Sequence, residues 1–400
     1  MPAEPPFGPL EAHGQPQEFG EVVDGDGMSP LMGLEVRSVQ TRRDLERFIT
    51  FPWAIYRGDP LWVPPLLPER RRALDPRRGT FFKRGEAELF LALQDGEVVG
   101  TICAGEDRTA NARRGRRECI FGFFECYPDS SIAGALLERV QGWARKRGLD
   151  TLFGPFNLDY EDSYGILIEG RDRPPAILCG HTPPYYRDLI EGYGFEKARG
   201  DNLAFAISIA EEGPERRRLT RLAERMRRRG WVRVRGADLS AWEREVDNVY
   251  ALINRSLEHL PDHIGWERES LRATLASFRR FADPELVLFA EVEGRPVGWF
   301  PGVPNLNEAL IHANGLRRPW DALRLAYHLR QQPACLAVKS VLVLPEYWQT
   351  GVAVLLFDEL ARRAAAKGYQ WADLSLTSED NPYTVSYTHL RAHETSLHLV

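Results

Sequence analysis

The sequence has few cysteines and no long apolar run. Its 400 residues include five cysteines, an odd number, and no two of them form a C-x-x-C pair. Scattered thiols of this kind are typical of a reducing compartment and argue against a disulfide framework or a cysteine-based zinc site. No apolar stretch is long enough to cross a bilayer, and the first residues lack the basic and apolar segments of a signal peptide. We therefore expect a cytoplasmic protein with no membrane partner and no metal.

A strong excess of charge of one sign is also missing. The formal net charge is −5, and 43% of the residues are hydrophobic, as in soluble globular proteins. The arginine runs at Arg70–Arg72 and Arg216–Arg218 are interpreted as solvated faces, because nucleic-acid-binding domains usually carry a basic balance. We expect no nucleic-acid partner. The length is too great for one ordinary core and is comfortable for two domains.

The chain contains an internal repeat. Tyr127–Gly148 matches Tyr347–Gly368 at one constant spacing, and upstream of each lies a hairpin pattern, at residues 88–100 and 285–298. Each half reads as a strand, a helical region, a hairpin, a third long strand, a helix and a strand. This order predicts a mixed α/β sheet and not an all-parallel one. The stretch from about Asn305 to Gln332 has no counterpart in the first half and is interpreted as an insertion.

These patterns predict five segments along the chain. We expect a Pro- and Gly-rich disordered tail, a first domain, a linking basic helix, a second domain and a non-native tail that resembles read-through sequence. Their expected bounds are residues 1–32, 33–210, 211–230, 231–385 and 386–400. If the last segment is foreign, the second domain is incomplete.

One loop carries the clearest chemical signal. The apolar run Val341–Leu344 predicts a strand, Pro345–Gly351 a tight turn, and Val352 onward a helix that ends near Gly368. The first turn of a helix offers free backbone N–H groups and about half a positive charge, and small residues let that backbone approach a phosphate closely. The loop therefore predicts a diphosphate cradle, with an ordinary strand-to-helix turn as the alternative.

At these residues the chain resembles the GCN5-related N-acetyltransferase (GNAT) superfamily, present twice. The loop P-E-Y-W-Q-T-G-V-A and the hairpins that end in a glycine pattern carry the resemblance, which covers about 33–205 and 231–385. Asp59–Pro65 is similar to the D-P-x-W-V-P-P pattern of one subgroup. The resemblance implies two tandem α/β domains of the acyl-CoA N-acyltransferase type, each a mixed, mostly antiparallel sheet flanked by helices. It implies transfer of an acetyl group from acetyl-CoA to an amine of a small molecule or peptide.

The resemblance also implies which residues bind acetyl-CoA. The strand would offer backbone groups to the pantetheine arm, and the turn and first helical residues would bind the phosphates. The expected residues are Val341, Leu342, Val343, Gln349, Thr350, Gly351, Val352, Ala353 and Val354. Trp348 stands where the family has arginine or glutamine, and it either covers the site or packs outside it.

The first copy departs further from the family pattern. Ser131 replaces the loop glycine, and Asp129 puts an anion where a phosphate would lie. Ile190 stands where many members have a general-acid tyrosine, and we expect Tyr185, Tyr186 and Tyr193 to serve in aromatic packing. The first copy is therefore interpreted as degenerate, with a role in shaping an acceptor site between the domains.

The chemistry needs a base that takes a proton from the amine. Glu346 beside the loop and Glu379 after the next strand are the candidates, with solubilising surface carboxylates as the alternative. The acidic segment Asn157–Asp162 either binds an amine or is a solvated loop, and His181 is interpreted as structural.

Rival functions stay open at this point. A catalytically silent acyl-CoA sensor, an interaction module and an aminoacyl or other acyl transferase fit the same resemblance. The sequence leaves the acceptor, the acyl chain length and the oligomeric state undetermined.

Overall fold

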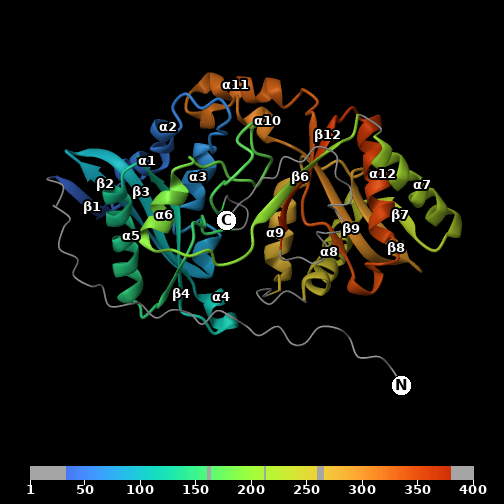
Figure 1. Cartoon of the computed structure of the whole chain (residues 1–400), viewed down its shortest axis with the longest axis horizontal. Helices are drawn as coiled ribbons and strands as arrows, with labels where there is room; N and C mark the ends of the chain where they lie inside the picture. The colour runs from blue at the N-terminus through green and yellow to red at the C-terminus, as the bar shows by residue number, and fades with distance from the viewer. Residues whose placement is uncertain (1–32, 160–163, 211–212, 259–264, 380–400) are drawn as a thin grey trace.

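The computed structural model describes residues 33–159, 164–210, 213–258 and 265–379. The predicted tails at 1–32 and 386–400 lie outside these residues. Two α/β halves lie side by side, and α11 (Pro319–His328) lies at the top, above the first half and the junction between the halves (Figure 1). Among the described residues no helix combines the length and the apolar character needed to cross a bilayer. All five cysteines are free and buried.

The first half is a five-stranded sheet in the order β1-β2-β3-β4-β5, antiparallel except for the parallel pair β4 and β5. Its elements are β1 (Leu34–Ser38), α1 (Arg42–Thr50), α2 (Pro52–Ile55), α3 (Leu67–Ala73), η1 (Phe81–Lys83), β2 (Gly85–Gln94), β3 (Glu97–Asp107), α4 (Arg108–Arg114), β4 (Glu118–Cys126), α5 (Ser130–Arg145), β5 (Thr151–Phe153) and α6 (Tyr186–Tyr193).

The alternation of side chains along β2 explains why both faces of this sheet are covered. Phe90 and Ala92 belong to the core cluster beneath α5 and α6, whereas Leu91 and Leu93 belong to the cluster beneath α1 and α3. Successive strand residues point to opposite faces, so an unbroken apolar run of this kind requires helices on both sides.

The second half is built on a larger sheet in the order β6-β12-β10-β9-β8-β7, with β11 paired to β9. Its elements are α7 (Pro214–Arg229), β7 (Arg233–Gly236), η2 (Leu239–Ala241), α8 (Trp242–Leu257), α9 (Arg268–Phe278), β8 (Val287–Val292), β9 (Arg295–Pro304), α10 (Asn307–Leu310), η3 (Asn314–Leu316), α11, β10 (Cys335–Val338), β11 (Leu342–Val343), η4 (Pro345–Tyr347), α12 (Val352–Ala366) and β12 (Trp371–Ser378). The linking helix predicted from the sequence is α7.

One strand crosses between the halves. β6 (Asn202–Ser208) follows the first half in the chain but pairs antiparallel with β12, from Ser208 opposite Trp371 to Asn202 opposite Ser378 (Figure 1). β6 lies before residue 210, inside the bounds expected for the first domain, but it completes the sheet of the second half and takes no part in the five-stranded sheet of the first.

The third long strand expected in the second half is broken in two. β10 pairs with β9 at Gly302–Pro304, and β11 pairs with β9 at Gly298 and Trp299. Pro301 lies between these two registers and has no N–H to donate, and Ser340 in the connecting turn has a φ of 54°.

Candidate functional site

The predicted diphosphate loop folds as expected into a turn before α12. No side chain caps α12, and Gly351, at its N-cap, has a φ of 84°. That left-handed conformation favours glycine over any other residue. A Cβ on Gly351 would lie 2.3 Å from the Sδ of Met226 on α7, so a buried thioether already packs against one side of this cap.

Trp348 folds back onto the strand. Its indole N–H donates a hydrogen bond to the carbonyl oxygen of Val343 at 2.7 Å. This bond occupies one of the backbone groups that the sequence reading assigned to the pantetheine arm. Leu342, Val343 and Val352 are buried, and Gln349 is exposed.

The two predicted bases lie on the surface in ion pairs. Arg255 donates to the Glu346 carboxylate at 2.7 Å, and both side chains are about half exposed. Glu379 accepts from Lys197 at 3.2 Å and from the backbone N–H of Asp201 at 2.8 Å. Neither carboxylate lines the cavity described next.

A cavity of about 800 Å³ lies between the halves. The carboxyl-terminal part of β4 forms one wall, because β5 pairs with β4 only as far as Ile120 and leaves Phe123, Phe124 and Glu125 without a neighbouring strand on that side. α1, α3, α9, α10 and α11 contribute further wall residues. The cavity falls within the size range of small-molecule binding sites, and much of its wall is aliphatic or aromatic.

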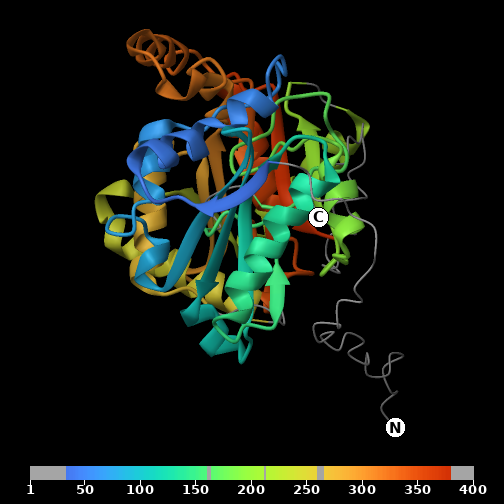
Figure 2. The same cartoon turned by 90° about the vertical axis from the view of Figure 1, so that its left-hand side faces the viewer.

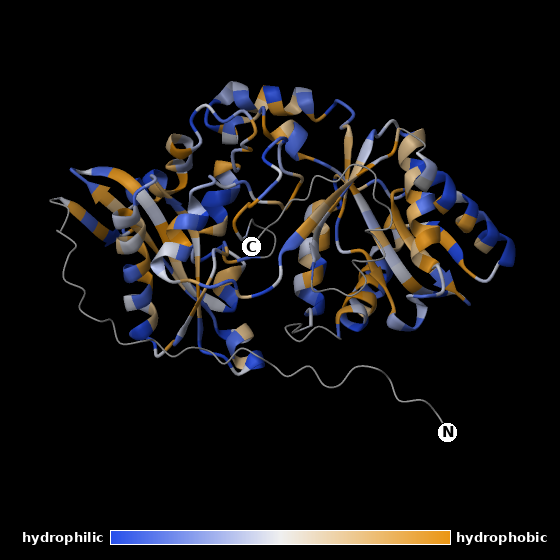
Figure 3. Ribbon diagram, viewed as in Figure 1, coloured by the Kyte–Doolittle hydropathy of each residue, from blue (hydrophilic) through white to orange (hydrophobic). Residues whose placement is uncertain are grey.

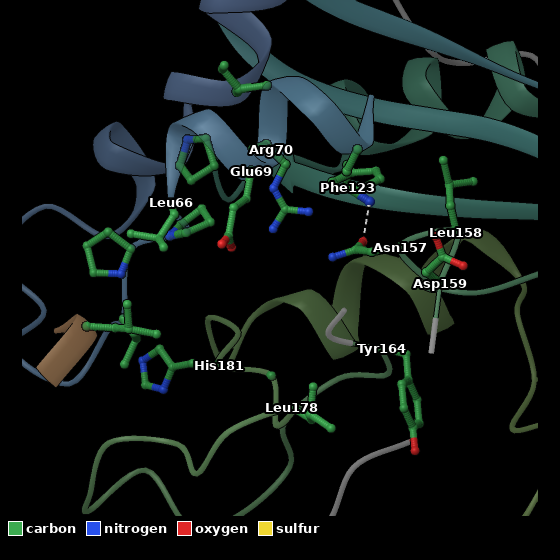
Figure 4. A pocket seen from close by; sticks show the side chains of 18 of the residues that line it. Leu66, Glu69, Arg70, Phe123, Asn157, Leu158, Asp159, Tyr164, Leu178 and His181 are labelled. Carbon is green, nitrogen blue, oxygen red and sulfur yellow. Dashed lines mark hydrogen bonds between the residues drawn. The ribbon is translucent and has the colours of Figure 1, made fainter. Parts of the chain in front are cut away.

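Polar side chains converge on the cavity from several elements. Figure 4 shows Glu69 and Arg70 of α3 directed into it, with His181 across the space. β4 contains a bulge at Phe123, where its register with β3 shifts and the φ is 48°. Asn157 holds this bulge in place, because its Oδ1 accepts from the backbone N–H of Phe123 at 2.6 Å. The β4 bulge therefore turns the following residues toward the cavity.

Glu125 is the carboxylate best suited to proton transfer. The hydroxyl of Tyr186 donates to its Oε2 at 2.6 Å. Burial raises the pKa of Glu125 to about 7, although hydrogen bonds from Tyr186 and Tyr56 oppose the rise. Burial also raises the pKa of both tyrosines. A carboxyl group with a pKa near 7 can accept and release a proton at neutral pH, which is the property that a general base requires.

The Asp59–Pro65 motif builds the neighbouring wall. The Asp59 carboxylate lies 2.7 Å from His181 Nε2, and the Trp62 ring stacks on Tyr56 with 4.8 Å between centroids. Burial opposes ionisation of Asp59, but hydrogen bonds from His181 and the backbone hold its pKa below its usual value. Trp62 and the residues that follow it, through Pro65, line the cavity. The motif therefore forms a rigid aromatic and proline-rich side of the cavity.

A buried polar cluster joins the cavity to the second half. Cys179, which lines the cavity, contacts Ser375 Oγ at 3.1 Å and Lys339 Nζ at 3.4 Å, and Lys339 pairs with Asp373 at 2.9 Å. Burial opposes a charge on Lys339, yet Cys179 and Asp373 raise its pKa. The cluster lies where β10 and β12 part after the pair Ala337 and Asp373. The cavity therefore borders the place where β4 and β5 separate in the first half and the place where β10 and β12 separate in the second.

Sequence reasoning missed the convergence of these residues. Tyr186 packs against aromatic rings as predicted, but its hydroxyl also binds Glu125, which is far away in the sequence. His181 was interpreted as structural and Glu125 was not singled out. The acidic segment contributes Asn157 and Asp159 to the cavity, although Asp159 is paired with Arg84 at 2.6 Å and residues 160–163 lie outside the described chain.

The comparisons with known proteins point to one family. The model of the acetyltransferase (GNAT) family matches residues 246–388. The second half therefore carries a match to the GNAT family. A tandem GNAT protein from the clavulanic acid biosynthesis pathway has a similar fold, with a TM-score of 0.52 and 12% identity over 92% of this chain and 97% of that one. The two halves described above therefore have a tandem GNAT-like fold, and the predicted fold class is confirmed.

Two curated relatives align over most of the chain. A bacterial ceramide synthase of Caulobacter vibrioides is 29% identical over 370 residues, covering 92% of this chain and 93% of the relative. Protein YghO of Escherichia coli is 27% identical over 355 residues, covering 86% of this chain and 89% of the relative. Both alignments span both halves of the chain, so the similarity extends to the whole tandem arrangement.

Proposed function

We propose that this protein is an N-acyltransferase that moves an acyl group from acyl-CoA to the amine of a lipid-like acceptor. The observation that carries the proposal is the large, mainly apolar cavity with a single carboxylate of pKa near 7, Glu125, on its wall. The similarity to a ceramide synthase supports it, because a ceramide is the amide of a fatty acid and a sphingoid amine. A cavity of this size and lining suits a long alkyl chain better than an acetyl group alone.

In this proposal Glu125 accepts a proton from the acceptor ammonium group. The free amine then attacks the thioester carbonyl, a C–N bond forms and the C–S bond breaks. The CoA thiolate leaves and takes up a proton, and the amide nitrogen loses its second proton. Positioning of the amine beside the thioester supplies much of the rate enhancement, and Glu125 adds general base catalysis of about 10²–10⁴-fold.

The donor's phosphates are proposed to bind at the N-terminus of α12. The uncapped first turn and the left-handed Gly351 suit an anion, whereas in the first copy Asp129 already accepts from the backbone N–H of Ser131 at 2.8 Å. In the first copy the Asp129 carboxylate therefore occupies the N-terminus of α5, where a phosphate would otherwise bind. The proposed division gives phosphate binding to the second copy and acceptor binding to the cavity.

A thiol-release assay tests the function. Purified protein is mixed with acetyl-CoA, octanoyl-CoA or palmitoyl-CoA and with a long-chain 2-amino alcohol or a short amine. We expect thiol release to be fastest with the long-chain donor and the long-chain amine. Faster release with acetyl-CoA would favour the acetyl specificity expected from the sequence. Binding of acyl-CoA without thiol release for any pair would contradict the proposed catalysis and support an acyl-CoA sensor.

A further inference from the structure

The helix α11 exposes an apolar face to solvent. Of the seven large hydrophobic residues that are exposed in the described chain, four lie on α11 or directly after it: Trp320 at 51%, Leu323 at 74%, Tyr327 at 63% and Leu329 at 42%. Trp320, Leu323 and Tyr327 follow helical spacing and therefore share one face. An outward apolar stripe of this kind on a surface helix marks an interaction site.

The helix is firmly attached to the molecule at its base. Trp53 Nε1 donates to Asn314 Oδ1 at 2.8 Å, and a Cβ on Gly315, which has a φ of 66°, would lie 2.5 Å from the Trp53 ring. The ring of His328 stacks on that of His312 at 3.8 Å. Figure 2 shows α11, in orange, projecting from the top of the molecule. The exposed stripe is therefore held on a fixed element.

Basic side chains surround the apolar stripe. Arg317, Arg318, Arg324 and Arg330 are all exposed, and Asp321, the acidic residue of α11, is buried and accepts from the backbone N–H of Arg318 at 2.9 Å. Figure 3 shows hydrophobic and hydrophilic residues interleaved along this helix. Exposed tryptophan, leucine and tyrosine with arginines at the edges is the composition of a helix that lies in the interface of an anionic membrane.

The opposite side of α11 reaches the cavity. Leu325 lines the cavity from the middle of the helix, and Leu329 lines it while remaining partly exposed, together with Leu310 of α10. One helix thus carries an outward apolar face and an inward one that borders the cavity. A lipid that left a bilayer at α11 would meet apolar side chains up to the cavity.

We propose that α11 docks the protein on the surface of an anionic bilayer, with Trp320, Leu323 and Tyr327 inserted among the lipids and the arginines at the headgroups. The sequence led us to expect no membrane partner, but that expectation rested on the lack of a spanning segment, and an interfacial helix needs none. Docking would bring the cavity next to membrane lipids. The role in substrate delivery rests on the proposed function, whereas docking itself does not.

Vesicle flotation tests the docking. Full-length protein is floated with vesicles of phosphatidylcholine alone or with about one-third phosphatidylglycerol. We expect binding to the anionic vesicles, a loss of about tenfold or more in the Trp320→Ser/Leu323→Ser variant, and a loss of roughly fivefold for each of Arg324→Glu and Arg330→Glu. Leu222→Ser removes a leucine that is 45% exposed on α7 and is expected to leave flotation unchanged.

Each outcome bears on the proposal. Absence of wild-type binding to anionic vesicles, or equal binding by the α11 and Leu222 variants, would overturn it. A concentration-dependent dimer that the Trp320→Ser/Leu323→Ser variant abolishes, without vesicle binding, would assign the same face to a second copy instead. Flotation requires no turnover, so it can succeed while the thiol-release assay fails, and the reverse also holds.

Discussion

The role proposed for Glu125 can be tested by replacing it with glutamine. Glu125→Gln keeps the shape of the side chain and an oxygen that can accept the 2.6 Å hydrogen bond from Tyr186, but it removes the titratable proton. We expect thiol release to fall by about 10²–10⁴-fold, because the general base is lost while the cavity wall stays in place. Glu346→Gln serves as the matched control, since that carboxylate is exposed and paired with Arg255, and we expect it to retain activity.

The pKa of Glu125 sets the expected pH dependence. With a pKa of about 7, the wild-type kcat/KM should rise about tenfold per pH unit below pH 7 and level off above it, because only the ionised carboxylate accepts a proton. The glutamine variant should lack this step. The difference between the two profiles isolates Glu125 from titration of the amine itself.

The same pKa predicts an opposite effect on stability. The carboxyl of Glu125 is raised from 4.5 to about 7, so the folded state binds the proton more tightly than the unfolded state. Its stabilising contribution is complete below pH 4.5 and is lost as the pH rises through 7. Between pH 5 and pH 9 the loss corresponds to about 2–3 kcal/mol, because one pKa unit is worth about 1.4 kcal/mol and a small part of the contribution is already lost at pH 5. Between pH 5 and pH 9 the wild type should lose that much stability relative to Glu125→Gln in urea titrations.

Two results would refute this reasoning. An active Glu125→Gln enzyme would show that the proton leaves by another route. Parallel stability curves for the two proteins across this pH range would show that the carboxyl has an ordinary pKa, and a base with an ordinary pKa would not produce the expected step at pH 7.

Three further substitutions follow from the structure. Gly351→Asp should abolish acyl-CoA binding in isothermal titration. The added carboxylate would repel the phosphates, and the added Cβ would collide with the side chain of Met226. Lys339→Met should destabilise the protein by about 3–5 kcal/mol in urea by leaving Asp373 buried without its partner, and Lys339→Met/Asp373→Leu should recover most of that loss. His181→Asn should cost about 1.5 kcal/mol at pH 7, and the cost should shrink as the pH falls through the lowered pKa of Asp59, measured by thermal unfolding.

The local elements of the fold were predictable because their signals are local. The apolar spacing from Val352 to Leu360 and the closing Gly368 define α12, and the hairpin glycines Gly96 and Gly294 both have positive φ. The repeat then supplied the tandem arrangement. What the sequence could not supply was the crossing of β6, because the pairing of Asn202–Ser208 with β12 depends on which sheet edge is free in three dimensions.

The candidate site was harder to predict for the same reason. Glu125 follows a bulge in β4 at Phe123 and Phe124. No sequence pattern marks a bulge formed by two ordinary apolar residues. The D-P-x-W-V-P-P motif was visible, but its use as a cavity wall depends on the contact between Asp59 and His181. Of the two expected bases, Glu346 lies beside the loop and Glu379 follows the next strand, and both lie on the surface.

The contacts between the copies explain why a copy without a phosphate cap would be kept. The first copy supplies Glu125 on β4. The segment between its β5 and α6 places Cys179 in contact with Lys339 and Ser375 of the second copy. The backbone N–H of Ile177 donates to Asn305 Oδ1, and Asn307 Nδ2 donates to the carbonyl oxygen of Pro175, so the same segment is fixed against the insertion that contains α11. Loss of the first copy would remove the proposed base, one wall of the cavity and the strand β6 together. Under the proposed function the two halves therefore build one site, and we expect the second half alone not to form a competent acceptor site.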